Sequence, residues 1–330
     1  MVHVVVTGAG GFLGSRLTRE ILKSGELAPA GAPSRPVTRV TLIDQAPAPA
    51  DLAADERVTA VRGDLTGLDA GALEGADVVF HLAAAVSAEC EADFDLGIHA
   101  NLRGTEALLA ACRALGSGPV VVFSSSVAVF GGTAEHPLPA VIEDSTLPVP
   151  QTSYGAQKAI GEYLLADYSR KGYLRGRALR LMTVTVRPGR PNRAASGWVS
   201  GIIREPLAGQ PVTCPVPPDT EVAVASPAKA VTALLRAATS PQHMWGDATA
   251  VTMPALTISA GEMAAALERV AGPEVSALID WAPDPVLTAM MRGWPARVKA
   301  DRAARLGLTP DTDFDSVIRL HREECDTVIP

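Results

Sequence analysis

The N-terminus constrains the fold of this chain more than any other segment. Residues 3–7 form an apolar, β-branched run that leads directly into Gly8-Ala-Gly-Gly-Phe-Leu-Gly14, and residues 15–23 then have a helix-like composition. A strand that passes through a glycine turn into a helix is the arrangement that a dinucleotide site requires. We therefore predict a dinucleotide-binding site at the start of the chain.

The residues of the turn have separate expected roles. Gly8 allows the tight turn, Gly11 lets the backbone approach a pyrophosphate, and Gly14 permits close packing of the helix on the strand. Phe12 and Leu13 lie in the same turn, where the free N–H groups of the helix N-terminus face the phosphates. The alternative is a glycine-rich turn without a ligand.

A second apolar run, residues 40–44, ends in Asp44. At the tip of the second strand, a carboxylate can accept hydrogen bonds from the adenosine ribose and would repel a 2′-phosphate, so it favours NAD over NADP. Asp44 lies further from the glycines than is usual because residues 25–36 are read as a Pro-, Gly- and Ala-rich loop insertion. The alternative role of Asp44 is to cap a turn.

The alternation of strands and helices continues along the chain. Apolar runs at residues 58–62, 76–85 and 119–126 read as strands, and residues 93–115 have helical spacing without proline. Short apolar runs that alternate with helices indicate a parallel sheet covered on both faces. The predicted fold is therefore an α/β, doubly wound parallel sheet.

Tyr154 and Lys158 stand four residues apart, and Ser126 closes the run Phe-Ser-Ser-Ser. On a helix, this spacing places a phenol and an ammonium on one face. A neighbouring cation lowers the pKa of a tyrosine, which would suit Tyr154 as a base, while Ser126 could hold the reacting oxygen. The alternative is that Tyr154 and Lys158 belong to a solvated helix face.

These motifs together resemble the extended short-chain dehydrogenases/reductases over about the first 190 residues. The matching features, in order, are Gly8-x-x-Gly11-x-x-Gly14, Asp64-Leu65, His81-Leu82-Ala83-Ala84, Asn101, Ser126 and Tyr154-x-x-x-Lys158. The resemblance implies NAD as cofactor and Ser126, Tyr154 and Lys158 as the catalytic residues.

The same resemblance assigns the remaining cofactor contacts. Asp64 and Leu65 would bind adenine, Leu82 and Ala83 would pass along the cofactor, and Asn101 would serve the fold and a proton-relay water. It also implies a homodimer formed through helices near residues 93–115 and 152–170.

Residues 186–192, 194–207 and 213–216 are similar to one branch of this family, which oxidises the C2 hydroxyl of a four-carbon sugar acid with NAD. Common sugar-nucleotide epimerases usually carry Tyr where Phe130 stands, and a different segment in place of residues 187–192. The resemblance therefore implies a small anionic sugar-acid substrate.

Arginines crowd the stretch that follows residue 186. Guanidinium groups bind carboxylates in a fork geometry, so such a cluster suits an anionic substrate, although phosphate would suit it as well. Alternatively, several of them are surface arginines paired with Glu205 or other acids. The candidate substrate-binding residues are Ser87, Ser126, Tyr154, Arg187, Arg190, Asn192, Arg193 and Arg204.

Composition limits the possible partners. A net charge of −7 and a pI near 5.4 argue against nucleic acid or an anionic membrane as partner. The 4 cysteines form no Cys-x-x-Cys pair and the 6 histidines show no metal-ligand spacing, so we expect reduced thiols and no metal. No apolar stretch reaches the length of a spanning helix, and we expect a cytoplasmic enzyme.

Two domains are expected, a NAD-binding domain over residues 1–190 and a substrate-binding lobe over residues 191–330, with some segments returning to the sheet. In the second part, prolines break the chain into shorter pieces. We predict helices at 197–208, 227–238, 259–271 and 314–325, and short strands at 212–216 and 221–225.

Two other functions stay open. A nucleotide-sugar epimerase would use the same Ser, Tyr and Lys with tightly bound NAD, although an aromatic content of 4% argues mildly against a pocket that stacks a base. A noncatalytic NAD-binding regulator would have no need for the three catalytic residues together. The fold alone does not decide between these functions.

Overall fold

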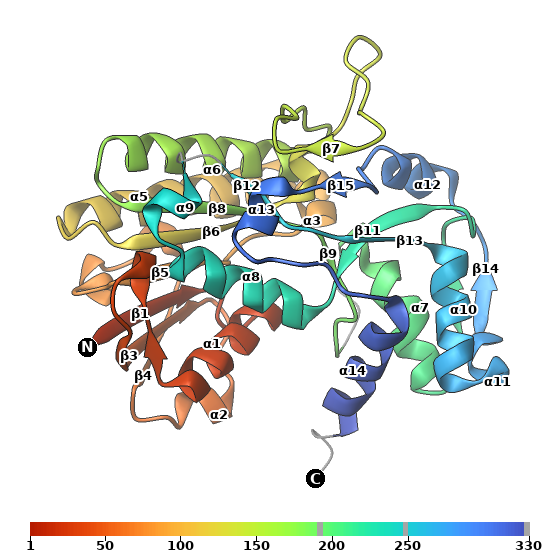
Figure 1. Ribbon diagram of the computed structural model, residues 1–330, viewed down its shortest axis with the longest axis horizontal. Coiled ribbons are helices and arrows are strands. Elements are labelled where there is room, and N and C mark those ends of the chain that lie inside the picture. Colours follow the sequence, from red (N-terminus) through yellow and green to blue (C-terminus); the bar gives the residue numbers. More distant parts are fainter. Residues whose placement is uncertain (190–193, 247–249, 327–330) are drawn as a thin grey trace.

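The sheet is built outward from strand β1 (Val2–Thr7), all six residues of which are buried. β-Branched residues buried on both faces are typical of the centre of a parallel sheet. The computed structural model describes residues 1–189, 194–246 and 250–326 (Figure 1). In it, β1 pairs in parallel with one strand on each side, in register from Val4 to Thr7.

The main sheet is eight-stranded among the described residues. Its parallel strands lie in the spatial order β4 (Val58–Arg62), β3 (Arg35–Asp44), β1, β5 (Val78–His81), β6 (Val120–Ser126), β8 (Arg175–Leu181) and β12 (Val251–Thr252). The chain builds one half from β1 through β3 to β4, and then returns to the other side of β1 with β5. This reversal beside β1 is the topological switch point at which such sheets bind ligands, and the doubly wound fold is confirmed.

Successive residues of a strand point to opposite faces, so the sheet supports two hydrophobic cores. Val4 and Val6 belong to one core and Val5 to the other. Helices cover each core from its own face of the sheet. The helices are α1 (Phe12–Ser24), α8 (Pro227–Thr239) and α13 (Asp301–Arg305) on the first face, and α5 (Gly104–Ala114) and α6 (Ser153–Arg170) on the second. In Figure 1, α1 and α8 lie low and α5 and α6 lie at the top.

The insertion before β3 is more ordered than expected. Gly25 ends α1 with a left-handed φ of 69°, which turns the chain back on itself. Strand β2 (Glu26–Leu27) then pairs antiparallel with the start of β3, and a 3₁₀ turn, η1 (Pro29–Gly31), joins them. The prediction of a loop over residues 25–36 is therefore wrong, because both ends of this segment pair as strands.

The helix predicted over residues 93–115 is divided. After α3 (Ser87–Ala92) come α4 (Phe94–Gly97), a π-helical segment η4 (Ile98–Arg103) and then α5. Segments with π-helical bonding inside longer helices often occur at functional sites. Here the segment carries Asn101, whose side chain is buried.

The C-terminal part has its own core, which includes Trp198, Val199, Ile202 and Ile203. The elements that build it are α7 (Gly197–Leu207), β10 (Val212–Cys214), β11 (Glu221–Ala225), β13 (Leu256–Ser259), α10 (Ala260–Ala271), α11 (Pro273–Ser276), β14 (Ile279–Trp281), α12 (Pro285–Arg292) and α14 (Phe314–Asp326). Between them, α8, α9 (Gln242–Trp245) and β12 return to the main sheet.

Smaller elements connect the two parts. The short strand β9 (Thr183–Val184) follows β8 and pairs with β11, so the chain passes from the main sheet directly into the second core.

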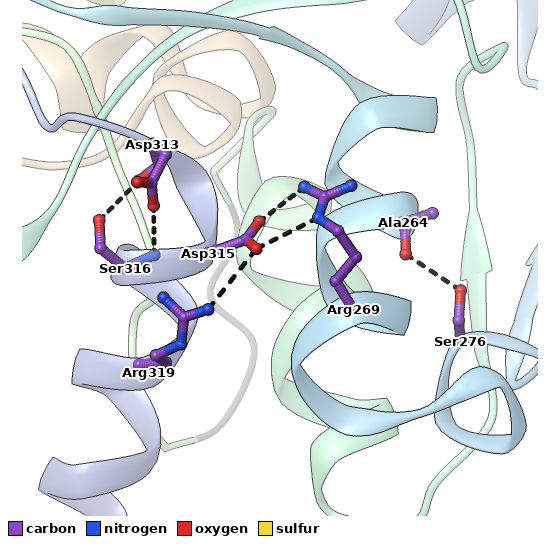
Figure 2. A network of polar contacts seen from close by, with 7 residues as sticks. All are labelled: Ala264, Arg269, Ser276, Asp313, Asp315, Ser316 and Arg319. Atoms are coloured by element: carbon purple, nitrogen blue, oxygen red, sulfur yellow. Dashed lines mark hydrogen bonds and ion pairs between the residues drawn. The ribbon is translucent and has the colours of Figure 1, made fainter.

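At the surface of that core, Asp315 of α14 accepts hydrogen bonds from Arg269 Nε at 3.1 Å and Nη2 at 2.6 Å (Figure 2). The remaining elements are α2 (Ala50–Ala53), η2 (Leu65–Gly67), η3 (Ala70–Leu73), η5 (Val127–Val129), β7 (Ile142–Glu143) and β15 (Val298–Lys299).

Among the described residues, no helix is both long enough and apolar enough to cross a bilayer. Within the same residues, no group of three or more His, Cys, Asp or Glu side chains is placed to hold a metal ion.

Candidate active site

The glycine turn between β1 and α1 has no room for side chains. Gly8 has φ of 70°, and a Cβ added there would lie 2.6 Å from the backbone nitrogen of Ala83. A Cβ on Gly14 would collide with the carbonyl oxygen of Gly8, so the helix packs directly on the turn. The expected structural roles of Gly8 and Gly14 are thus confirmed.

The N-terminus of α1 suits a pyrophosphate. Gly11 is the N-cap, has extended backbone angles, and provides no side-chain cap for the amides of the first turn. Phe12, Leu13 and Gly14 of that turn line a cleft at the carboxyl ends of the parallel strands. Uncapped amides at the positive end of a helix dipole bind anions, so this part of the chain fits a dinucleotide.

Two adjoining hollows of about 430 Å³ and 490 Å³ lie along the carboxyl ends of the parallel strands. They share Gly8, Gly11, Leu82 and Ala84, so together they form one long cleft that crosses the switch point. Each hollow has the size of an ordinary ligand site. The cleft is therefore long enough to hold an extended dinucleotide with a substrate at one end.

One end of the cleft carries the residues expected near adenosine. Asp44 accepts hydrogen bonds from the backbone N–H groups of Gly10 and Ala46, each at 2.9 Å, which fix its carboxylate at the end of β3. Asp64 accepts from Thr66 N at 2.8 Å, and this bond holds the pKa of its carboxyl below the usual value. Leu65 and Ala83 also line this end.

Asn101 lies behind the cleft and lines neither hollow. Its side chain is 3% exposed and accepts a hydrogen bond from Ala85 N at 2.8 Å. Its amide donates to Ala85 O at 3.1 Å and to Gln157 Oε1 at 2.8 Å. The structure therefore gives Asn101 bonds that connect η4 with α6 and with the segment after β5, and places it in no direct contact with the cleft.

The other end of the cleft holds the three residues expected to carry chemistry. Tyr154 and Lys158 lie on one face of α6, which begins at the N-cap Thr152, and Ser126 is the last residue of β6. All three line the first hollow. Lys158 Nζ donates to the carbonyl oxygen of Ser124 at 2.8 Å and lies 5.6 Å from the centre of the Tyr154 ring.

The electrostatics correct one expectation. Burial raises the pKa of Tyr154 to about 12, while hydrogen bonding to Ser126 and the charge of Arg187 act in the opposite direction. Burial also lowers the pKa of Lys158 to about 8. The prediction that the neighbouring Lys158 lowers the pKa of Tyr154 below its usual value is therefore wrong for this structure, because desolvation of the phenol outweighs the groups that lower its pKa.

Of the predicted arginines that the structure describes, Arg187 is the one whose charge acts on Tyr154. Arg187 follows β9, is partly exposed in the first hollow, and has no ion-pair partner among the described residues. Arg204 is already engaged, because it donates to Arg187 O at 2.8 Å and to Glu205 Oε1 at 2.6 Å. The predictions for Arg190, Asn192 and Arg193 concern positions outside the described residues.

Ser87 lies on the opposite wall, at the start of α3. It is 7% exposed, and its hydroxyl accepts a hydrogen bond from Ala195 N at 3.2 Å. This bond joins the first part of the chain to the segment that leads into α7. Ser87 therefore helps to fix the wall of the cleft that comes from the C-terminal part.

Ser200 and Trp294 are among the residues that line this site and were not predicted from the sequence. Ser200 Oγ accepts a hydrogen bond from Arg187 N at 3.1 Å and so fixes the backbone of that arginine. Its signal was a serine within the apolar face of the helix predicted at 197–208. Trp294 also lines the cleft, and no pattern in the sequence connects it with the strand ends.

His81 lies close to the site, but both of its ring nitrogens are engaged by threonine hydroxyls in the interior. It is 1% exposed, and its ring nitrogens contact Thr7 Oγ1 at 2.8 Å and Thr105 Oγ1 at 2.9 Å. Burial lowers its pKa to about 3, and the charge of Lys158 adds to this shift. His81 therefore remains neutral and joins β1, β5 and α5.

A doubly wound sheet with a glycine turn, an acid at the end of the second strand and a Ser/Tyr/Lys set in one cleft defines a class: the NAD-dependent oxidoreductases of the short-chain type. The sequence model described as the NAD dependent epimerase/dehydratase family matches residues 4–243. The chain belongs to this family, and its cofactor is NAD.

Two curated relatives match along nearly the whole chain. D-erythronate dehydrogenase of Cupriavidus necator is 46% identical over 328 residues, which are 98% of each chain. D-erythronate dehydrogenase of Haemophilus influenzae is 36% identical over 96% of this chain and 98% of its own.

Among solved structures, the crystal structure of the nucleoside-diphosphate-sugar epimerase from Agrobacterium tumefaciens has a TM-score of 0.89 to this chain. The two are 42% identical over 98% of this chain and 94% of that one.

Proposed function

We propose that this chain oxidises the C2 hydroxyl of a small sugar acid, D-erythronate, to the 2-oxo acid 2-dehydro-D-erythronate, with NAD as the oxidant. The similarity to two curated D-erythronate dehydrogenases over nearly the full chain supports this substrate. The structural observation that carries the proposal is that the guanidinium of Arg187 shares the cleft with Tyr154 and Ser126. An acid bound through Arg187 would hold its neighbouring carbon close to the phenol.

Tyr154 is the proposed base, because it is the phenol in the cleft beside both Ser126 and Lys158. In this role it takes the proton of the C2 hydroxyl, while Ser126 donates a hydrogen bond that orients the same oxygen. When bound, NAD supplies the acceptor for the C2 hydride and the positive charge of its nicotinamide. Lys158 would hold the nicotinamide ribose and favour the ionised form of Tyr154.

Arg187 is the proposed carboxylate ligand. Its partner at the backbone, Ser200, holds its peptide N–H at 3.1 Å, and Arg204 holds its carbonyl oxygen at 2.8 Å. These two bonds fix the backbone from which the Arg187 side chain extends into the cleft. A planar guanidinium can donate two parallel hydrogen bonds to a carboxylate, a geometry that the ammonium of lysine does not offer.

The cofactor contacts are proposed from the walls of the cleft. Asp44 would bind the adenosine ribose, and Asp64 and Leu65 the adenine. The remaining proposed contacts are Gly8, Gly11, Phe12, Leu13, Gly14, Leu82, Ala83, Tyr154 and Lys158, all of which line one of the two hollows. Asn101 would act on this site through its bonds to Ala85 and Gln157.

Cofactor binding and substrate binding are assigned to different parts of the chain. We propose that residues 1–190 bind NAD and that residues 191–330 form the substrate lobe. A homodimer in the cytoplasm is also proposed, supported by the exposed apolar side chains of Phe94 on α4 and Tyr163 on α6, which are 61% and 64% exposed.

The test is to mix the purified chain with NAD and a panel of four- to six-carbon aldonic and uronic acids, and to follow NADH by absorbance. We expect NADH with D-erythronate. Arg187→Lys should lower kcat/KM for the acid by about 10- to 100-fold and leave the KM for NAD unchanged, because one charge-assisted hydrogen bond is lost. Equal losses for the acid and for NAD would contradict the carboxylate role.

The other candidate function is epimerisation of a nucleotide sugar, which the 42% identical epimerase from Agrobacterium tumefaciens favours. An epimerase returns the hydride to its substrate, so it would copurify with NAD and release no NADH. Turnover of nucleotide sugars together with no NADH from any acid would replace the proposed function with this one.

A further inference from the structure

A buried ion pair lies beneath the catalytic residues. Glu162 of α6 is 6% exposed and Arg180 of β8 is 7% exposed. Arg180 donates to the two carboxylate oxygens of Glu162, from Nε at 2.9 Å and from Nη2 at 2.7 Å. The guanidinium also lies 4.8 Å from the centre of the buried Phe130 ring. A buried charge pair contributes little to stability, so stability alone does not explain why this pair is present.

The pair is connected to the strand that carries Ser126. Ser125 Oγ donates to Glu162 Oε1 at 2.5 Å, and Ser125 is 2% exposed. In the sheet, Ser125 and Ser126 lie opposite Arg180 and Leu181 of the neighbouring strand. The carboxylate of Glu162 thus binds both strands one residue before the catalytic serine.

Lys158 makes the adjacent contact. Tyr154, Lys158 and Glu162 are spaced four residues apart on α6 and therefore lie on one face of the helix. Lys158 Nζ binds Ser124 O at 2.8 Å, and Glu162 binds the hydroxyl of Ser125. Two successive turns of α6 are therefore bonded to two successive residues of β6.

Helix α6 packs so closely against the end of β6 that two of its positions have no room for a side chain. A Cβ on Gly161 would lie 2.7 Å from the Phe123 ring, and a Cβ on Gly155 would collide with Ala128 O. Glycine at both positions lets α6 approach the end of β6 directly. Packing then sets the separation of helix and strand, and the polar bonds set their position along the helix axis.

We propose that Glu162, held by Arg180, is a positioning residue that fixes α6 against β6, so that Tyr154 meets Ser126 and Lys158 keeps its positive charge. This inference rests on the proposed function, because it assumes the catalytic roles of these three residues. Glu162 touches no reacting atom in this scheme and acts through Ser125 and Lys158.

The charged and titratable neighbours of Lys158 support the proposal that Glu162 helps Lys158 to keep its positive charge. Burial lowers its pKa to about 8, and the Cys90 thiol of α3 and the Glu162 carboxylate oppose that shift. The remaining groups that face it are Tyr154 on α6 and His81 on β5, which is neutral. Among the described residues, Glu162 is therefore the carboxylate whose charge favours the protonated form of Lys158.

The kinetic test uses Glu162→Gln. We expect kcat to fall by about tenfold or more at neutral pH, with the KM for NAD nearly unchanged. Without the carboxylate, Lys158 loses its proton at lower pH, so the alkaline limb of the kcat profile should move down by about one pH unit. Asp315→Asn is the matched control, because it changes an acid to an amide in another forked arginine pair, shown in Figure 2.

A double variant separates positioning from stability. Glu162→Leu with Arg180→Met removes the whole pair without leaving a buried charge, a replacement that proteins commonly tolerate. We expect this variant to fold, to melt near the wild-type temperature and to remain slow. Wild-type kcat in the folded double variant would overturn the proposal.

A measurement without substrate completes the test. The chain has lysines at 23, 158, 171, 229 and 299, so isotope labelling at lysine Cε gives one NMR signal for each. Lys158→Gln assigns the signal of Lys158, whose pKa should be lower in Glu162→Gln than in the wild type. An unchanged pKa would overturn the proposal, whereas a wild type inactive on every acid would count against the proposed function alone.

Discussion

Tyr154 bears the largest chemical demand in the cleft, because a phenol whose pKa is raised to about 12 must still accept a proton near neutral pH. Tyr154→Phe removes only the hydroxyl, so the ring can keep its packing. We predict that kcat falls by about 10²- to 10⁴-fold while the affinity for NAD stays within about twofold. Steady-state kinetics and a calorimetric titration with NAD measure the two quantities, and substantial residual turnover would exclude Tyr154 as the base.

Asp44 should set the choice between NAD and NADP. Its carboxylate is fixed by Gly10 and Ala46 at the end of β3 and would oppose a 2′-phosphate. For Asp44→Ala we predict weaker NAD binding and a lower ratio of NAD to NADP in kcat/KM, by about tenfold or more. Comparing both cofactors with one substrate provides the measurement, and a constant preference would move the specificity to another residue.

The sequence predicted which residues meet in the cleft, but it did not predict their pKa values or their bonding partners. Motif order placed Ser126, Tyr154 and Lys158 together because strand ends and helix faces follow simple periodicities. The raised pKa of Tyr154 depends on the burial of the complete site, which spacing does not reveal. Arg204 pairs with its neighbour Glu205, which was one of the alternatives open from the sequence. Its second bond, to the backbone carbonyl of Arg187, depends on the folded chain, which brings the two residues together.

At the level of elements, the contact between β1 and α1 holds the turn that would receive the pyrophosphate. A methyl group on Gly14 would collide with Gly8 O, so Gly14→Ala must push the helix away from the turn. We predict a loss of about 1–3 kcal/mol in the free energy of unfolding, together with weaker NAD binding.

Gly67→Ala is the control for that substitution, because Gly67 has no heavy atom within 4 Å of an added Cβ. Its stability should stay within about 0.5 kcal/mol of the wild type. Urea unfolding of both variants supplies the comparison. Equal stability of the two variants would show that α1 can shift freely over the turn.

Elements with a clear period were predictable, and those defined by long-range pairing were not. The helices and strands that were predicted for the C-terminal part are observed close to their predicted positions, for example α7 and β11. Strand β2 exists only because β3 offers it a partner, and η4 interrupts a sequence that reads as one helix. Trp294 reaches the cleft through the packing of the second core, which no local pattern encodes.

For the whole molecule, buried neutral histidines predict acid sensitivity. The folded pKa of His81 is about 3, against 6.5 for the free side chain, so the unfolded chain binds more protons between these values. Stability is therefore complete above pH 6.5 and falls as the pH decreases towards 3. From pH 6.5 to 5 we predict a loss of about 2 kcal/mol from His81 alone.

Denaturant unfolding at several pH values measures this loss. His3 and His321 also have pKa values lowered chiefly by burial, and they add to the slope in the same direction. His81→Gln should be less stable at pH 7, because two threonine contacts change, but its stability should fall less steeply below pH 6.5. The same slope in the variant and the wild type would show that His81 is protonated in the folded protein.

D-erythronate deuterated at C2 shows whether this chain removes a hydride from C2 of a small sugar acid. The purified chain is incubated with this substrate and NAD, and the reduced cofactor is analysed by mass spectrometry. We predict NADH that carries one deuterium, together with the 2-oxo acid. Unlabelled NADH would contradict attack at C2, and no reduced cofactor with D-erythronate would contradict the proposed function.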